Sequence, residues 1–276
     1  MQNSEWRKKK RIGNMLLTII VLIILYLPIF SAIWGSLTPS SKIGDLSVLP
    51  KYFEYENYIE VWQKTQLGLY MKNSIIYSTI GAVFATILSI LGGYAISRFR
   101  FWGKSLYMFL ILTTQMIAVT TIAVPLFLYV QRLGLFDSSI TVITISAIVT
   151  MPLLVWLLKN TFDAFPVELE EAAVIDGCTQ RQIFQYVVLP VTTPGIVTAL
   201  SISFITVYNQ FFIPLLLLST SEKYPVLVAV YTLLNERLVP WHLVMAAALI
   251  GLFPTLIVFM FTQKYVKEGL STGAIK

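Results

Sequence analysis

The sequence predicts an all-helical protein that crosses a membrane several times. Of its 276 residues, 57% are hydrophobic and only 12% are charged, and the mean hydropathy is +0.76. A soluble domain of this length cannot bury so much apolar surface. Six uncharged stretches are each long enough to cross a hydrocarbon core about 30 Å thick. They predict six transmembrane helices in one membrane domain over residues 1–276.

The six predicted spans follow the apolar stretches of the sequence, at residues 12–36, 73–97, 105–130, 138–158, 195–218 and 241–263. An alternative count of five would merge or omit the fourth span, because it is the shortest and contains Pro152. Other prolines lie in or near the spans, where neighbouring helices can satisfy the freed carbonyl groups. Kinked helices of this kind suit a pore.

The amino terminus carries a basic cluster, with five Lys and Arg residues at positions 7–11. Such a cluster before an apolar run is also typical of a signal peptide. The run at 15–34 is longer than a usual signal core, and no small-residue cleavage site follows it. We therefore expect an uncleaved first span with the basic cluster in the cytoplasm.

The distribution of basic residues sets the expected orientation in the lipid bilayer. With the amino terminus inside, thirteen of the twenty Lys and Arg residues fall in cytoplasmic segments, and the short loop at 98–104 is strongly basic. Six spans return the carboxyl terminus to the cytoplasm. The same count places the polar stretch at 165–194 inside.

The stretch at 165–194 has the pattern of two short helices joined by a tight turn. Pro166 suits a first helical position, and three carboxylates favour the positive end of the helix dipole: Glu168, Glu170 and Glu171. Gly177 stands where a C-terminal cap is expected. The simplest interpretation of such a stretch is a solvated connector between two spans.

The second short helix is predicted to begin directly after this turn. Thr179 and Gln182 have the spacing of a capping box. Pro190 and Pro194 are expected to limit the helix at its far end.

The residue types in this stretch resemble the EAA loop of binding-protein-dependent ABC transporter permeases. The resemblance rests on Glu171, Ala172, Ala173, Asp176, Gly177, Ile183, Leu189 and Pro190. It implies the fold of the type I ABC importer permeases, in which this loop forms coupling helices that dock in a cleft of the ATP-binding subunit. The small side chains of Ala172 and Ala173 suit insertion into a groove, and Gly177 allows a close turn.

Two further segments resemble carbohydrate permeases of the maltose type. The carboxyl-terminal QKYVKEGLSTGAIK is similar to the family's tail, which implies a contact with the ATP-binding subunit through Gly269, Gly273 and Lys276. In the fifth span, YNQFFIPLLLL departs from the usual family form at Tyr208 and Gln210. The aromatic and acidic residues in the external segment at 37–71 fit either an interfacial belt or a contact with a solute-binding protein.

Motifs for catalysis and cofactor binding are missing from the sequence. Gly103, Lys104 and Ser105 lack the first glycine of a phosphate-binding loop, because Arg98 stands in its place. One cysteine and one histidine leave no disulfide and no Cys/His metal site. We expect no enzyme activity, no nucleic-acid partner and no cofactor on this chain, with ATP and Mg²⁺ bound by partner subunits.

Uncharged polar residues in the spans are candidates for the substrate path, namely Gln115, Thr120, Thr121, Tyr129, Tyr208, Asn209 and Gln210. Such groups can hydrogen-bond hydroxyls, while aromatic rings stack on sugar rings. Their alternative role is to hold one helix to another. The pattern favours a neutral or weakly charged saccharide as the substrate class.

The resemblance implies a sugar importer in the bacterial cytoplasmic membrane, with an oligosaccharide as the expected cargo. Its expected partners are a second, homologous permease, two ATP-binding subunits and an extracytoplasmic sugar-binding protein. The alternative is a secondary carrier or channel that ATP does not drive. The span cores lack the ionisable residues that ion-coupled carriers use, so the sequence favours the ABC importer.

Overall fold

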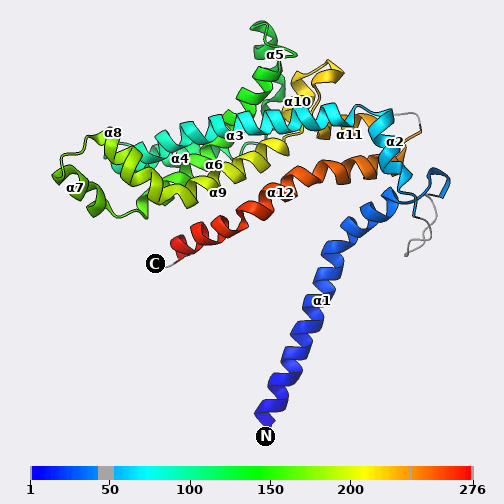
Figure 1. Ribbon diagram of the computed structural model, residues 1–276, viewed down its shortest axis with the longest axis horizontal. Helices are drawn as coiled ribbons and strands as arrows, with labels where there is room; N and C mark the ends of the chain where they lie inside the picture. Colours follow the sequence, from blue (N-terminus) through cyan, green and yellow to red (C-terminus); the bar gives the residue numbers. More distant parts are fainter. Residues whose placement is uncertain (1, 43–52, 236–237, 275–276) are drawn as a thin grey trace. The chain divides into compact units, whose positions relative to one another are not determined.

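The computed structural model describes residues 2–42, 53–235 and 238–274, and every regular element among them is helical (Figure 1). The chain divides into two compact units. One unit comprises Met1–Leu67 and Val230–Gly251, and the other comprises Gly68–Ala229 and Leu252–Lys276. The predicted all-helical class is confirmed.

The first unit is built on α1 (Gln2–Ser36), η1 (Ser40–Lys42), α2 (Glu56–Lys64) and the start of α12 (Trp241–Ala274). The Asn57 side chain donates hydrogen bonds to the carbonyl oxygens of Ser36 at 2.9 Å and Thr38 at 3.1 Å. The hydroxyls of Ser36 and Tyr58 lie 2.7 Å apart. These bonds, together with the fully buried Val61, fix α2 to the end of α1.

The second unit contains three long helices that pack together: α3 (Leu67–Arg98), α6 (Ser139–Asp163) and α9 (Leu189–Tyr208) (Figure 1). A Cβ atom on Gly195 of α9 would lie 2.3 Å from the side chain of Thr161 on α6. Only glycine permits so close an approach, as is usual where membrane helices pack through small residues. α6 itself continues through Pro152. It ends at Asp163, five residues later than predicted.

The third span is two helical pieces, where one continuous helix was predicted at 105–130. α4 (Lys104–Thr114) is followed by η2 (Val119–Ile122) and α5 (Ala123–Arg132), and the two halves differ in direction by 86°. Pro125 falls in the first turn of α5, where its missing N–H needs no helical partner. The helix restarts before this proline, so the span predicted at 105–130 is present but is broken more sharply than a proline kink.

The fifth span also differs from its prediction at 195–218. α9 begins at Leu189 and ends at Tyr208, and a separate α10 (Phe212–Leu217) follows. Pro214 lies in the first turn of α10, as Pro125 does in α5. The span therefore starts and ends earlier along the chain than its apolar residues indicated.

The sequence predicted that Pro190 and Pro194 limit the second short helix. This prediction was wrong, because the helix continues through both prolines. α8 (Gln180–Ile183) runs through the π-helical turn η3 (Phe184–Val188) into α9. In that turn the Leu189 N–H donates to the Phe184 carbonyl, five residues back. The wider turn accommodates Pro190, which has no N–H to donate.

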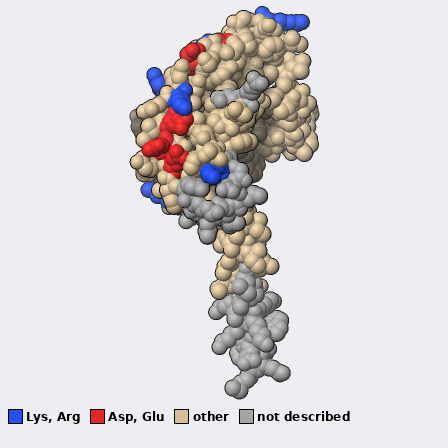
Figure 2. Space-filling model, turned by 90° about the vertical axis from the view of Figure 1, so that its right-hand side faces the viewer, with Lys and Arg blue, Asp and Glu red and all other residues tan. Residues whose placement is uncertain are grey.

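The number of spans agrees with the predicted six when the bent pair is taken as one. Within the described residues, five helices are long and apolar enough to cross a membrane, at Leu17–Ser36, Leu67–Arg98, Ser139–Asp163, Gln180–Tyr208 and Trp241–Tyr265. α4 and α5 supply the sixth as a broken span. Most of the surface visible in Figure 2 carries neither acidic nor basic side chains, as expected for a protein that faces lipid.

Candidate functional site

The predicted turn is present at the end of α7 (Val167–Ile175). Pro166 precedes the helix as its N-cap rather than occupying its first position. Gly177 has φ +85°, a left-handed conformation that side chains disfavour. The Gly177 N–H donates to the Val174 carbonyl and the Cys178 N–H to the Ala173 carbonyl, both at 3.0 Å. This pair of bonds is a Schellman cap, and the cap requires the left-handed residue.

The capping box of α8 is confirmed. The Thr179 N–H donates to Gln182 Oε1 at 2.8 Å, and the Gln182 N–H donates to Thr179 Oγ1 at 3.4 Å. Thus two separate caps, one ending α7 and one starting α8, define the turn between the helices. The local sequence alone is sufficient to specify this geometry.

The coupling-loop residues fall into two groups by burial. Ala173 and Ile183 are 8% and 0% exposed, and both belong to a core with Phe162 and Phe165. They hold the loop to the spans, so Ala173 does not share an outer face with Ala172. Leu189 is half-buried, while the remaining loop residues are exposed: Glu171, Ala172, Asp176, Gly177 and Pro190.

Large apolar side chains are exposed beside these residues. Ile175 is 86% exposed, Val174 52% and Tyr186 73%. α7 and α8 project at one end of the second unit (left in Figure 1). Exposed aliphatic and aromatic groups next to carboxylates are typical of a protein-binding surface. We call Glu171, Ala172, Val174, Ile175 and Asp176 the α7 surface.

The candidate path residues occupy the ends and breaks of helices. Tyr208 is 3% exposed, its hydroxyl lies 3.9 Å from Met71 Sδ, and its ring stacks on Phe204. Gln115 ends α4, and its amide nitrogen donates to the Val149 carbonyl of α6 at 3.0 Å. Gln115 thus holds helix to helix, which was the alternative role considered for these groups.

Asn209 is exposed and Gln210 is half-buried, both at the break between α9 and α10. Three further candidates are exposed along η2 and α5, namely Thr120, Thr121 and Tyr129. The broken third span meets the short helix that follows α9, because α10 packs against both η2 and α5. Their shared core includes Val130 and Ile213.

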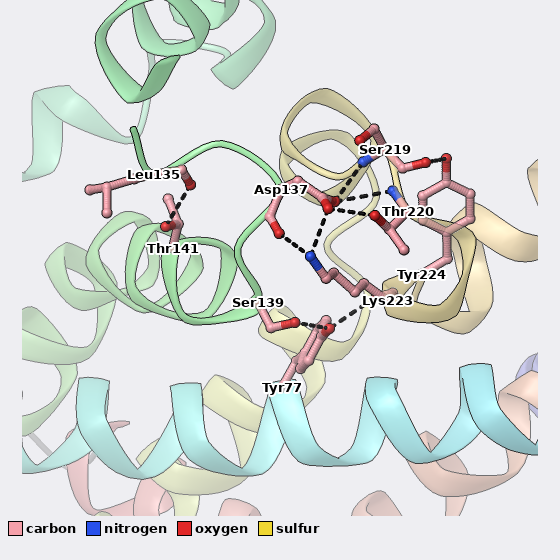
Figure 3. Close-up of polar contacts among 9 residues, drawn as sticks. All are labelled: Tyr77, Leu135, Asp137, Ser139, Thr141, Ser219, Thr220, Lys223 and Tyr224. Carbon is pink, nitrogen blue, oxygen red and sulfur yellow. Dashed lines mark hydrogen bonds and ion pairs between the residues drawn. The ribbon is translucent and has the colours of Figure 1, made fainter. Parts of the chain in front are cut away.

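An ionic junction lies at the opposite end of α6 from α7, and the sequence did not indicate it (Figure 3). The Asp137 carboxylate accepts from Lys223 Nζ at 2.6 Å, from the N–H groups of Ser219 at 2.9 Å and Thr220 at 3.1 Å, and from the Thr220 hydroxyl. The Tyr77 hydroxyl of α3 donates to the Lys223 carbonyl at 2.9 Å. Lys223 and Thr220, with these two N–H groups, hold the pKa of the Asp137 carboxyl well below its usual range.

The predicted tail contacts lie at the limit of the described chain. Gly269 and Gly273 fall within α12, which extends to Ala274 rather than ending with the predicted span. Lys276 lies outside the described residues. The contact of the tail with an ATP-binding subunit stays a prediction.

The spans and the projecting helical loop define the protein as a polytopic membrane protein. Residues 85–272 match the family model described as "Binding-protein-dependent transport system inner membrane component". The chain belongs to this family. It is therefore the multi-pass, non-catalytic permease of an ABC transporter in the inner membrane, and ATP hydrolysis lies in a partner subunit.

Named relatives match from four fifths to nearly all of the chain. It is 29% identical to the inner membrane ABC transporter permease protein YcjP of Escherichia coli K12, over 98% of each chain. It is 31% identical to the trehalose/maltose transport system permease protein MalG of Thermococcus litoralis, over 80% of this chain and 81% of that one. A crystal structure of a bacterial ABC transporter that imports alginate contains a chain with a TM-score of 0.75 and 25% identity, covering 92% and 95% of the two chains.

Proposed function

We propose that this chain is one of two permease subunits of an ATP-driven importer for an oligosaccharide. The other components are a homologous permease, two ATP-binding subunits and an extracytoplasmic sugar-binding protein. Support comes from relatives whose names specify trehalose and maltose, and from the likeness to a transporter of the polysaccharide alginate. The family membership disfavours the alternative of a carrier or channel that ATP does not drive.

The α7 surface carries the coupling part of this proposal. Ile175, next to the capped turn, is 86% exposed. Contact of this apolar side chain with water is unfavourable, and a docked partner would cover it. Ala172 leaves room for a groove wall, and Glu171 and Asp176 offer charges at its edge. Ala173 and Ile183 support the surface from within. We assign the α7 surface to the cleft of an ATP-binding subunit, with Gly269, Gly273 and Lys276 as a second contact.

The substrate path is assigned to the two helix breaks. Irregular backbone in a membrane is tolerated where protein covers it or where it lines a water-filled cavity. Asn209 and Gln210 present amide groups at one break, and amides hydrogen-bond neutral sugar hydroxyls. The path requires the second permease for its other half. Tyr208 and Gln115 then serve mainly to fix the helices around it.

ATP hydrolysis by the assembled complex tests this function. When the chain is purified with its genomic neighbours in lipid nanodiscs, a sugar-loaded binding protein should raise the ATPase rate by about tenfold, a typical size of coupling between two sites. A panel of neutral disaccharides, neutral oligosaccharides and uronate oligosaccharides identifies the cargo class. Sugar uptake into vesicles that continues after ATP depletion would contradict an ATP-driven importer.

Both termini are assigned to the cytoplasm. The excess of basic residues at positions 7–11 and in the loop at 98–104 supports this orientation. Reporter fusions after Lys104 and after Lys276 should read cytoplasmic, and a fusion near Glu56 should read external. An external carboxyl terminus would show that the number of spans is odd.

A further inference from the structure

The coupling loop has a polar attachment to a helix that is distant in sequence. Both carboxylate oxygens of Glu170 on α7 bind to α3. Arg98 Nε donates to Glu170 Oε1 at 2.6 Å, and the Tyr94 hydroxyl donates to Glu170 Oε2 at 3.0 Å. The side chains of Arg98 and Glu170 are only 14% and 12% exposed. A charge-assisted pair that is shielded from water is strong and directional.

The rest of the Arg98 guanidinium also has partners at this end of the helices. Nη2 donates to the carbonyl of Phe165 at 3.3 Å, and Nη1 donates to the hydroxyl of Ser97 at 3.0 Å. The guanidinium carbon lies 5.9 Å from the ring centre of Tyr94 and 5.8 Å from that of Phe165. Arg98 therefore binds the start of the loop as well as α7 itself. Lysine could not reproduce this fork of donors.

The other contacts between the loop and the spans are apolar. Ala173 and Ile183 pack with Phe162 in the last turn of α6 and with Phe165 between α6 and α7. The Tyr94 ring of α3 also lies 4.8 Å from the ring of Phe184. Packed apolar side chains permit small sliding movements, whereas buried ionic bonds have a fixed geometry. The hydrogen bonds of Arg98 and Tyr94 tie α7 to α3, and Arg98 and Glu170 are 72 positions apart in the sequence.

We propose that Arg98 and Glu170 are positioning residues that make α3 move with the coupling loop. The proposal rests on the coupling function assigned to the α7 surface. Movement of an ATP-binding subunit would then reach α3 directly through the Glu170 carboxylate, in addition to the covalent connections to α6 and α9. In this proposal α3 moves together with α7 and does not stay fixed while α7 moves.

Substitution of the pair tests the proposal against a purely structural role. Glu170→Gln and Arg98→Met should lower sugar uptake by about tenfold or more, the usual size of a lost coupling free energy. Co-purification of the ATP-binding subunit should stay normal, because the α7 surface is unchanged. Arg98→Lys should have an intermediate effect on uptake.

Lys159→Met is the matched control, since it removes an ion pair with Asp163 within α6 at the same end of the helices. Wild-type uptake in Glu170→Gln at wild-type membrane levels would overturn the proposal.

A distance measurement keeps the proposal testable if these variants fail to accumulate. Spin labels are placed at two exposed positions, Glu168 on α7 and Arg100 just after α3, in a Cys178→Ala background. In the otherwise wild-type complex, this distance should stay constant when a non-hydrolysable ATP analogue binds. A shift on binding would overturn the proposal. If the coupling function itself is wrong, the unlabelled wild-type complex will lack sugar-stimulated ATPase activity, which is a separate result.

Discussion

Gly177→Val should strongly reduce transport while leaving the spans in the membrane. Gly177 has φ +85°, and an added Cβ would meet no atom within 4 Å. The damage therefore comes from backbone conformation, because a β-branched residue in the left-handed region is strained by about 1–2 kcal/mol. The Schellman cap opens, the α7 surface loses its shape, and uptake should fall by about tenfold or more. The measurements are uptake in vesicles and co-purification of the ATP-binding subunit.

Gly103 provides the matched control for this experiment. It also has φ +85° with no atom within 4 Å of an added Cβ, but it lies in the loop before α4. Gly103→Val imposes the same strain outside the coupling loop and should retain the ATP-binding subunit. Gly177→Asn should be milder than Gly177→Val, because asparagine tolerates the left-handed region. Normal uptake with Gly177→Val at normal expression would show that the loop is only a connector.

The turn was predictable because its signals are local. Gly177 must adopt a conformation that side chains disfavour, and Thr179 and Gln182 satisfy each other within one helical turn. The number of spans was predictable for a related reason, since apolar length is set by the thickness of the bilayer. These properties depend on residues that are close together in the sequence.

The helix breaks were not predictable from hydropathy. The helices α4 and α9 end at Thr114 and Tyr208. Prolines lie in the first turns of α5 and α10, which follow these breaks, and α10 packs on η2 and α5. An apolar run has the same composition whether its helix is straight or broken. The same limit explains why Pro190 was taken as a terminator, when a π-helical turn allows the helix to continue through it.

The two ionic contacts escaped sequence analysis because their partners are distant in the chain. Glu170 had been interpreted only as a charge near a helix dipole, although it binds Arg98 of α3. Asp137 pairs with Lys223 over 86 positions. Each contact fixes one end of the second unit, and α6 separates them by roughly 37 Å, from its 25 residues at 1.5 Å each. The coupling loop and the Asp137 junction are thus anchored independently.

Asp137→Ala should release the junction at the end of α6 opposite the coupling loop. The change removes the acceptor of Lys223 Nζ and of the Ser219 and Thr220 N–H groups, and it places alanine at φ 55°. The loss is about 2 kcal/mol, equivalent to about thirtyfold in the local opening equilibrium. Hydrogen exchange of residues 219–224 in nanodiscs measures this effect. Asp137→Asn should be milder, because asparagine tolerates that φ.

Removing Lys223 should weaken the junction and make it less sensitive to pH. Because the pKa of Asp137 is depressed in the folded protein, its stabilising effect is complete above the unfolded value of about 3.9 and is lost as pH falls through the folded value. Wild-type protection should therefore not change between pH 7 and pH 5. Lys223→Met removes the largest cause of the depression, so the folded-state pKa moves closer to the unfolded value. The variant should therefore have lower protection at neutral pH and lose less of it than the wild type as pH falls below 4. Arg132→Met is the control, because Arg132 is an exposed charge that ends α5 near the junction. An identical pH profile for Lys223→Met and wild-type protein would show that Lys223 does not hold Asp137 in its charged form.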